Sequence, residues 1–263
     1  MGVRRFSADY LESTRTGMWS DREALADLEL GSRKRVLDVG CGTGELTRVL
    51  REESSGTVLG CDVDAELLSH VEKPVLRGDA TRLPIRSDSV DLVVCQALLI
   101  NLPDPAAALA EFARVSSDLV AAIEPDNSAV TVDSSVDSEG PLARRARERF
   151  LDGVDTDVSL GAGAQALFAD AGLDDIRTTR YDHERLIEPP YSEHALQDAK
   201  RKVSGEGIEQ NRETMLAGAT TPAEFDDLRA DWRAMGRTVV EQMQSKDYRR
   251  NETVPFYVTV GRV

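Results

Sequence analysis

The stretch Arg35-Val-Leu-Asp-Val-Gly-Cys-Gly-Thr-Gly-Glu-Leu46 decides the fold. Its apolar, β-branched first half suits a buried parallel strand, and three glycines at every second position then end that strand. Gly40, Gly42 and Gly44 allow positive φ angles and a close approach of the backbone to a ligand. Glu45 follows where a first helical turn is expected, and there the helix dipole favours a carboxylate. The stretch therefore predicts a strand, a tight ligand-binding loop and the start of a helix.

The spacing of the glycines excludes two common phosphate-binding loops. A dinucleotide fingerprint needs glycine at position 45, which is Glu45, and a Walker loop needs a Gly-Lys-Ser/Thr ending, which is absent. The pattern from Asp38 to Gly44, acidic-x-Gly-x-Gly-x-Gly, instead resembles motif I of the class I S-adenosylmethionine (SAM) dependent methyltransferases, of the kind called methyltransferase type 11.

Three further motifs carry the same resemblance. A second strand ends at Asp62, and an acid at that place in a doubly wound fold lies beside the glycine loop and can accept both ribose hydroxyls of a nucleoside. Gly78-Asp-Ala80 is similar to a family segment whose aspartate receives the adenine amino group, and 90–96 resembles the fourth strand of the family. The motifs occur in family order over roughly residues 33–126.

The resemblance implies a fold, a cofactor and a set of binding residues. The fold is α/β, a doubly wound Rossmann-like seven-stranded sheet whose last strand is antiparallel, with a helical insertion forming a cap. The cofactor is SAM, and the residues that would bind it are Tyr10, Arg15, Asp38, Gly40, Cys41, Gly42, Gly44, Asp62, Val63, Asp79, Ala80, Cys95 and Gln96.

The domain prediction divides the chain at two points. Residues 1–185 and 251–263 form the SAM-binding domain, with an N-terminal lid over 1–19, and residues 186–250 form the helical insertion over the acceptor pocket. Within the insertion, Thr221-Pro-Ala-Glu224 predicts a capped helix start. An apolar stripe at helical spacing follows, formed by Phe225, Leu228, Trp232, Met235, Val239 and Met243.

The leading segment admits two interpretations. Arg15 could pair with the methionine carboxylate of the cofactor, while Tyr10 or Trp19 covers the sulfonium. Alternatively, Arg15 lies on a solvated helix and the aromatic side chains dock on the core. The basic run of residues 142–150 also has two interpretations. It could receive an anionic substrate or, as is more common for such runs, form the solvated face of a helix.

The charge balance limits the partners. The net charge is −15, and 27 arginines stand against 5 lysines, which resembles the surfaces of proteins from salt-loving archaea. In molar salt the Debye length falls to about 3 Å, so repulsion among carboxylates is screened. A nucleic-acid partner is disfavoured because phosphate binding requires a basic surface. No apolar run reaches membrane-span length, so we expect a cytoplasmic protein, with its oligomeric state open.

The three cysteines, Cys41, Cys61 and Cys95, follow or end three predicted strands. They could converge as a thiol site for a metal, but no histidine lies near them in the sequence. We favour small apolar residues that fill gaps at strand ends, and predict no metal.

The function implied is methyl transfer from SAM to a small-molecule acceptor, without an assigned catalytic base. Asn101, Glu124, Asp126 and His183 are candidates for the cleft. A non-catalytic SAM-binding scaffold and a macromolecular acceptor (RNA or protein) remain alternatives. Glu188-Pro-Pro-Tyr191 looks like the motif of amino-group base methylases, but it stands far from the fourth strand.

Overall fold

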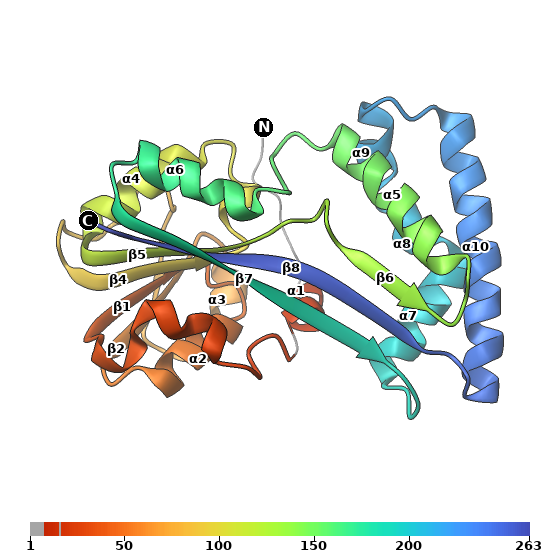
Figure 1. Ribbon diagram of the computed structural model, residues 1–263, viewed down its shortest axis with the longest axis horizontal. Helices are drawn as coiled ribbons and strands as arrows, with labels where there is room; N and C mark the ends of the chain where they lie inside the picture. Colours follow the sequence, from red (N-terminus) through yellow and green to blue (C-terminus); the bar gives the residue numbers. More distant parts are fainter. Residues whose placement is uncertain (1–7, 16) are drawn as a thin grey trace. The chain divides into compact units, whose positions relative to one another are not determined.

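The computed structural model describes residues 8–15 and 17–263, apart from the side chains of residues 9, 10, 12 and 13 (Figure 1). The chain divides into two compact units. The first unit comprises Met1–Asp126, Ser159–Tyr181 and Pro255–Val263. The second unit comprises Asn127–Val158 and Asp182–Val254.

Eight strands form one mixed sheet in the described part of the chain. They are β1 (Arg35–Val39), β2 (Thr57–Asp62), β3 (Val75–Arg77), β4 (Val90–Gln96), β5 (Ser116–Pro125), β6 (Thr131–Ser134), β7 (Asp174–Ile187) and β8 (Arg250–Arg262). Their order is β3-β2-β1-β4-β5-β8-β6, and β7 also pairs with β8. The first five strands pair in parallel, whereas β8 is antiparallel to β5. The doubly wound α/β class and the antiparallel last strand are thereby confirmed.

The predicted count of seven strands is wrong by one. The additional strand is β6, which pairs antiparallel with Arg250–Thr253 of β8. Its sequence, Thr-Val-Asp-Ser, is short and mostly polar, so it lacks the apolar run that predicts a buried strand. β6 is held by its place beside β8, and pairing of this kind between distant segments leaves little local signal.

Caps explain where several helices of the first unit begin. α3 (Ala65–Leu68) and α4 (Pro105–Val115) both start at an aspartate cap. Asp64 accepts a hydrogen bond from the Glu66 amide, and Asp104 accepts one from the Ala107 amide. Residues 20–23 lead into a 3₁₀ helix, Glu23–Leu28, without a side-chain cap on Arg22.

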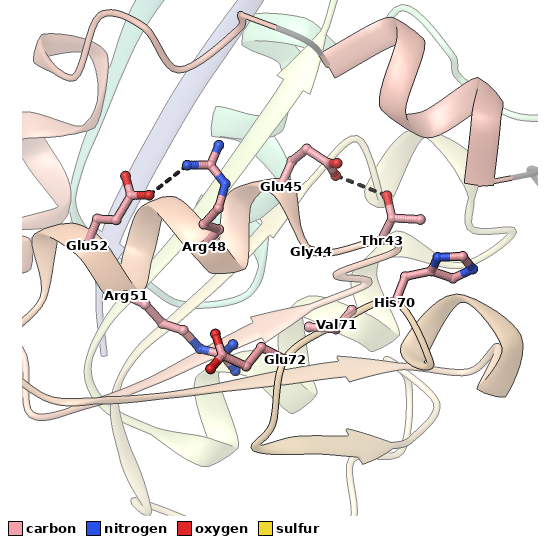
Figure 2. A pocket seen from close by; sticks show the side chains of 9 residues that line it. All are labelled: Thr43, Gly44, Glu45, Arg48, Arg51, Glu52, His70, Val71 and Glu72. Atoms are coloured by element: carbon pink, nitrogen blue, oxygen red, sulfur yellow. Dashed lines mark hydrogen bonds and ion pairs between the residues drawn. The ribbon is translucent and has the colours of Figure 1, made fainter.

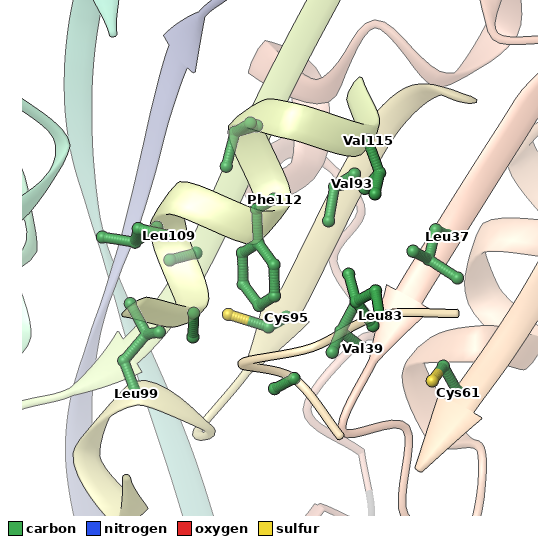
Figure 3. Close-up of a cluster of buried hydrophobic side chains, with 14 of the residues drawn as sticks. Leu37, Val39, Cys61, Leu83, Val93, Cys95, Leu99, Leu109, Phe112 and Val115 are labelled. Carbon is green, nitrogen blue, oxygen red and sulfur yellow. The ribbon is translucent and has the colours of Figure 1, made fainter. Parts of the chain in front are cut away.

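The core of the first unit lies between the sheet and the helices that cover it. Figure 3 shows Phe112 of α4 directed toward Cys95 of β4, with Leu109 and Val115 from the same helix nearby. The side chain of Phe112 is completely buried. This packing fixes the C-terminal ends of β1 and β4, from which the loops of the candidate site emerge.

Five helices belong to the second unit: α5 (Glu139–Gly153), α7 (Glu193–Ser204), α8 (Glu206–Glu209), α9 (Arg212–Ala217) and α10 (Pro222–Ser245). The capping box that begins α10 is confirmed, with Thr221 and Glu224 bonded reciprocally. The predicted stripe is buried along α10, except that Trp232 is only partly buried. This unit includes residues 127–158 in addition to the predicted insertion. A role as a cap stays a prediction.

Candidate cofactor site

The glycine loop has the predicted backbone conformation. Gly40, Gly42 and Gly44 have φ angles of 70°, 55° and 90°, which side chains rarely adopt. Gly44 is also the N-cap residue of α2 (Glu45–Glu53). The strand, tight loop and helix start predicted from 35–46 are therefore all present.

The loop is attached to the end of β2 by its own amides. The amides of Gly40 and Cys41 both donate to the carbonyl of Cys61, at 2.7 and 3.1 Å. The Gly44 amide donates to the Cys41 carbonyl, and the Gly42 amide donates to the Asp62 carboxylate at 2.9 Å. These four amides therefore already have acceptors within the protein.

Asp62 lies where the glycine loop and β2 meet. One carboxylate oxygen accepts from the Gly42 amide and the other from the Asp64 amide, each at 2.9 Å. The side chain is only partly buried. Each carboxylate oxygen can accept more than one hydrogen bond, so Asp62 retains capacity for hydroxyl donors. Val63 beside it is 52% exposed.

The segment after β3 brings the next predicted residues to the same edge. The Gly78 amide donates to the carbonyl of Asp62, which places the Gly-Asp-Ala segment directly beside the end of β2. Asp79 is exposed and accepts from the amide and hydroxyl of Thr81, at 2.9 and 2.8 Å. Ala80 is buried.

Asp38 differs from the other acids because it is buried. It accepts a hydrogen bond of 2.6 Å from the hydroxyl of Thr47 on α2. Burial raises the pKa of Asp38 to about 6, against the opposing effects of the Thr47 bond and the Arg15 charge. Asp38 thus ties β1 to α2, a role that its position before the glycines does not reveal.

The helix α1 (Ala8–Arg15) lies against the glycine loop. A β-carbon placed on Gly42 would lie 2.9 Å from Leu11 and 3.4 Å from the Arg15 guanidinium. Arg15 is therefore within reach of the loop, and glycine is needed at position 42 for that contact as well as for its φ angle. The side chain of Tyr10 lies outside the described residues.

Gln96 at the end of β4 has two side-chain partners. Its amide oxygen accepts from the Trp19 indole at 3.2 Å, and its amide nitrogen contacts the Met18 sulfur at 3.0 Å. Trp19 stacks on Tyr181, with ring centroids 5.8 Å apart. Gln96 is 3% exposed. Its side chain thus anchors the segment after α1.

The cysteines are free and buried. Cys61 and Cys95 belong to the main core cluster, and Cys41 packs with Leu68 and Val71. Burial raises the pKa of each thiol, that of Cys61 to about 12. Raised thiol pKa values suppress reactivity, which agrees with the interpretation as gap-filling residues.

The candidate bases are not alike. Glu124 is completely buried and accepts from three backbone amides, so it is not placed to take a proton from an acceptor. Asn101 is buried, and its amide donates to the Ala97 carbonyl at 2.8 Å. Asp126 ends the first segment of the first unit, whereas His183 is a buried residue of the second unit. A base stays unassigned.

A pocket that the sequence did not predict is lined in part by the end of the glycine loop (Figure 2). It is lined by Thr43, Gly44, Glu45, Arg48, Arg51, Glu52, His70, Val71 and Glu72. Arg48 pairs with Glu52 at 2.6 Å, and Arg51 donates to the carbonyls of Val58 and Pro74. Its arginines are therefore already bonded within the protein.

The comparisons with known proteins agree with this geometry. Residues 37–118 match the family described as methyltransferase domain. A demethylmenaquinone methyltransferase of Lactiplantibacillus plantarum is 36% identical over 107 residues, which cover 36% of this chain and 45% of the relative. One of Bacillus velezensis is 34% identical over 109 residues, covering 37% and 46%. The chain thus matches less than half the length of these relatives.

Solved structures support the fold. A proposed methyltransferase of Bacillus halodurans C-125 superposes with a TM-score of 0.51 at 12% identity, covering 92% of this chain and 99% of that one. One from an antibiotic biosynthesis pathway of Anabaena variabilis gives 0.50 at 14% identity, covering 88% and 96%. The chain shares its fold with these two structures. Residues 37–118 of the chain are thus similar to a methyltransferase domain.

Proposed function

We propose that this protein transfers a methyl group from SAM to a small-molecule acceptor. The observation that carries the proposal is Asp62, which ends β2 and contacts the amide of Gly42 at 2.9 Å. An acid here, beside a glycine loop with three positive φ angles, is the arrangement that holds the ribose of a nucleoside cofactor.

In this proposal, Asp62 and the residues around it each bind a different part of the cofactor. Asp62 accepts the ribose hydroxyls, Val63 offers its exposed side chain to the adenine face, and Asp79 with Ala80 receives the adenine edge. Arg15 takes the carboxylate of the methionine arm, because it lies beside Gly42 while four loop amides are engaged elsewhere.

When bound, SAM supplies an already activated methyl group. The protein therefore needs mainly to position the acceptor and exclude water. Because the relatives are named as methyltransferases of demethylmenaquinone, a small acceptor of quinone type is the first class to test. The acidic balance of the chain argues further against a nucleic-acid acceptor.

A non-catalytic SAM-binding protein is the second candidate. The observation that favours it is Glu124, the one candidate base on β5, whose carboxylate is occupied by backbone amides. Turnover separates the two functions. Transfer of labelled methyl to any member of a panel of quinols, phenols and amines supports the enzyme, whereas cofactor binding without product supports the binding protein.

Calorimetric titration with S-adenosylhomocysteine in high salt tests the cofactor site. We expect Asp62→Ala to weaken binding at least tenfold, because two charge-assisted hydrogen bonds to the ribose are lost. Asp64→Ala is the matched control, since it removes an acid two residues away whose role is to cap α3. Equal affinity in the Asp62→Ala variant and the parent would remove the basis of the proposal.

A further inference from the structure

Glu124 makes an unusual set of contacts for a buried carboxylate. One oxygen accepts from the amides of Leu98 and Leu99 at 3.1 and 2.9 Å, and the other accepts from the amide of Ile100 at 3.4 Å. These amides begin the short 3₁₀ helix Leu99–Asn101 that follows β4. Glu124 thus acts as a cap, supplied by the neighbouring strand rather than by the helix's own sequence.

The segment that Glu124 holds has a constrained backbone. Ala97 has a φ angle of 48°, which a residue with a β-carbon adopts at a cost. Its amide donates to the Ile123 carbonyl, and its carbonyl accepts from Asn101. The chain therefore turns sharply immediately after Gln96 and is fastened on both sides of the turn.

The turn directs Leu98 onto the first glycine of the cofactor loop. A β-carbon placed on Gly40 would lie 2.8 Å from the Cδ1 atom of Leu98, so the two residues are in direct contact. Three links consequently connect Glu124 to the loop: the carboxylate, the amides of 98–100, and the Leu98 side chain.

A carboxylate is an energetically unfavourable group to bury as a helix cap. Burial of an ionised group is unfavourable, and a neutral serine or asparagine can cap a helix start as well. The Cys95 thiol donates to the Glu124 carboxylate at 3.8 Å, and Tyr257 on β8 is the residue paired with Glu124. No positive charge is among the hydrogen-bonding partners found for Glu124 in the described part of the chain.

We propose that Glu124 is a positioning residue for the cofactor, which holds Leu98 over Gly40 and so sets the shape of the glycine loop. It does not touch the cofactor in this proposal. The effect of Glu124 on binding is transmitted through Leu98. The proposal rests on the proposed function, in which this unit binds SAM.

The test uses Glu124→Gln with S-adenosylhomocysteine titrations. Glutamine keeps the size of the side chain and one acceptor oxygen. Its NH2 group, however, is a donor and would face a backbone amide that donates to the glutamate oxygen in the parent protein. We expect five- to tenfold weaker binding at pH 8, without a matching loss of the unfolding free energy, since the variant also avoids burying a charge. Asp91→Asn is the matched control. Asp91 likewise accepts hydrogen bonds from two backbone amides, those of Lys34 and Arg35. These amides lie at the start of β1, whereas the glycine loop follows the end of β1.

A double-mutant cycle with Leu98→Ala separates positioning from general stability. If Glu124 acts through Leu98, each single change weakens binding and the double variant is hardly weaker than either one. Additive effects, or full affinity in Glu124→Gln, would overturn the inference. Failure of the parent protein to bind would instead refute the cofactor assignment itself.

Amide exchange of the parent protein covers the case in which Glu124→Gln does not fold. S-adenosylhomocysteine should slow exchange at 98–100 more than at 34–35. Equal changes at both places would count against a link between Glu124 and the cofactor.

Discussion

Glu124 in the first unit and Glu139 in the second are both almost completely buried, and the two carboxylates are stabilised in opposite ways. Glu124 in the first unit is bonded by backbone amides, and burial raises its pKa to about 7. Glu139 in the second unit is bonded by Lys202, Ser134 and Tyr248, and pairs with Arg250 at 3.3 Å. Burial raises its pKa too, but the positive charges and hydrogen bonds outweigh burial, so the pKa of Glu139 is lowered.

The difference shows what amide dipoles and full charges can each do. Three amides fix the position of a carboxylate but do not fully offset its loss of hydration. The pKa of Glu124 is therefore raised to about 7. Two cations keep Glu139 ionised, at the cost of burying several charges together. We therefore expect the first unit to respond to pH near neutrality and the second to respond to loss of a charged partner.

The largest effect is expected for Lys202→Met in the second unit. The ammonium of Lys202 bonds both Glu139 and the Tyr248 hydroxyl, and its removal leaves a buried carboxylate short of a partner. We expect a loss of about 3 kcal/mol of unfolding free energy. Urea unfolding monitored by Trp232, in a Trp19→Phe background, measures it in this unit.

Arg145→Gln provides the control for Lys202→Met. Arg145 pairs with Asp231 at 2.6 Å, but the side chains are 41% and 55% exposed. Its loss should lower the unfolding free energy by less than about 1 kcal/mol. If the two variants were equally mild, the Glu139 cluster would contribute no more than a surface ion pair.

The pH response of the first unit is expected to be the next largest. The folded pKa of Glu124 is about 7 and that of Asp38 about 6, both above their ordinary values, so the folded unit binds more protons than the unfolded chain. The contribution of these two groups to the unfolding free energy should therefore be greatest below their ordinary pKa values and fall as the pH rises through the folded ones. The change for Glu124 is on the order of 3 kcal/mol at most.

Glu139 should not contribute over that range. Its pKa is lowered, so its stabilisation is present above the ordinary pKa and is lost only as the pH falls through the lowered one. Urea unfolding at pH 5.5 and pH 8, followed by Trp19 and Trp232 separately, compares the units. Glu124→Gln should reduce the pH response of the first unit. A first unit that is insensitive to pH would contradict the raised pKa values.

The sequence predicted the first unit well because its signals are local. A glycine at every second position after a β-branched strand specifies a loop, and Asp62 and Asp79 follow their strands at short range. The sequence did not reveal the contacts of Glu124, because its partners come from residues 98–100, which no local pattern connects to β5. The same holds for Gln96, whose partners Met18 and Trp19 lie far away in the sequence.

The second unit was predicted less completely for the same physical reason. The apolar stripe of α10 has helical spacing and was recognised. β6 and the cluster around Glu139 arise from pairing between segments more than 60 residues apart, with Lys202 and Arg250 brought to Glu139 by the fold. Such contacts have no period in the sequence. The salt-loving origin of the protein also stays a prediction.

The smallest effect concerns two helix caps, one in each unit, where we expect the units to behave alike. Thr221 accepts from the Glu224 amide at 3.3 Å to begin α10, and Asp104 accepts from the Ala107 amide at 3.0 Å to begin α4. Replacing either residue with alanine should cost about 1 kcal/mol of unfolding free energy.

Urea unfolding at low and molar KCl then distinguishes the two caps. The Asp104 carboxylate also interacts with the helix dipole, so the cost of Asp104→Ala should shrink as salt screens that interaction. The Thr221 hydroxyl is neutral, and the cost of Thr221→Ala should change less. If both costs were insensitive to salt, the Asp104 cap would act through its hydrogen bond alone, and charge would distinguish the two units only where it is buried.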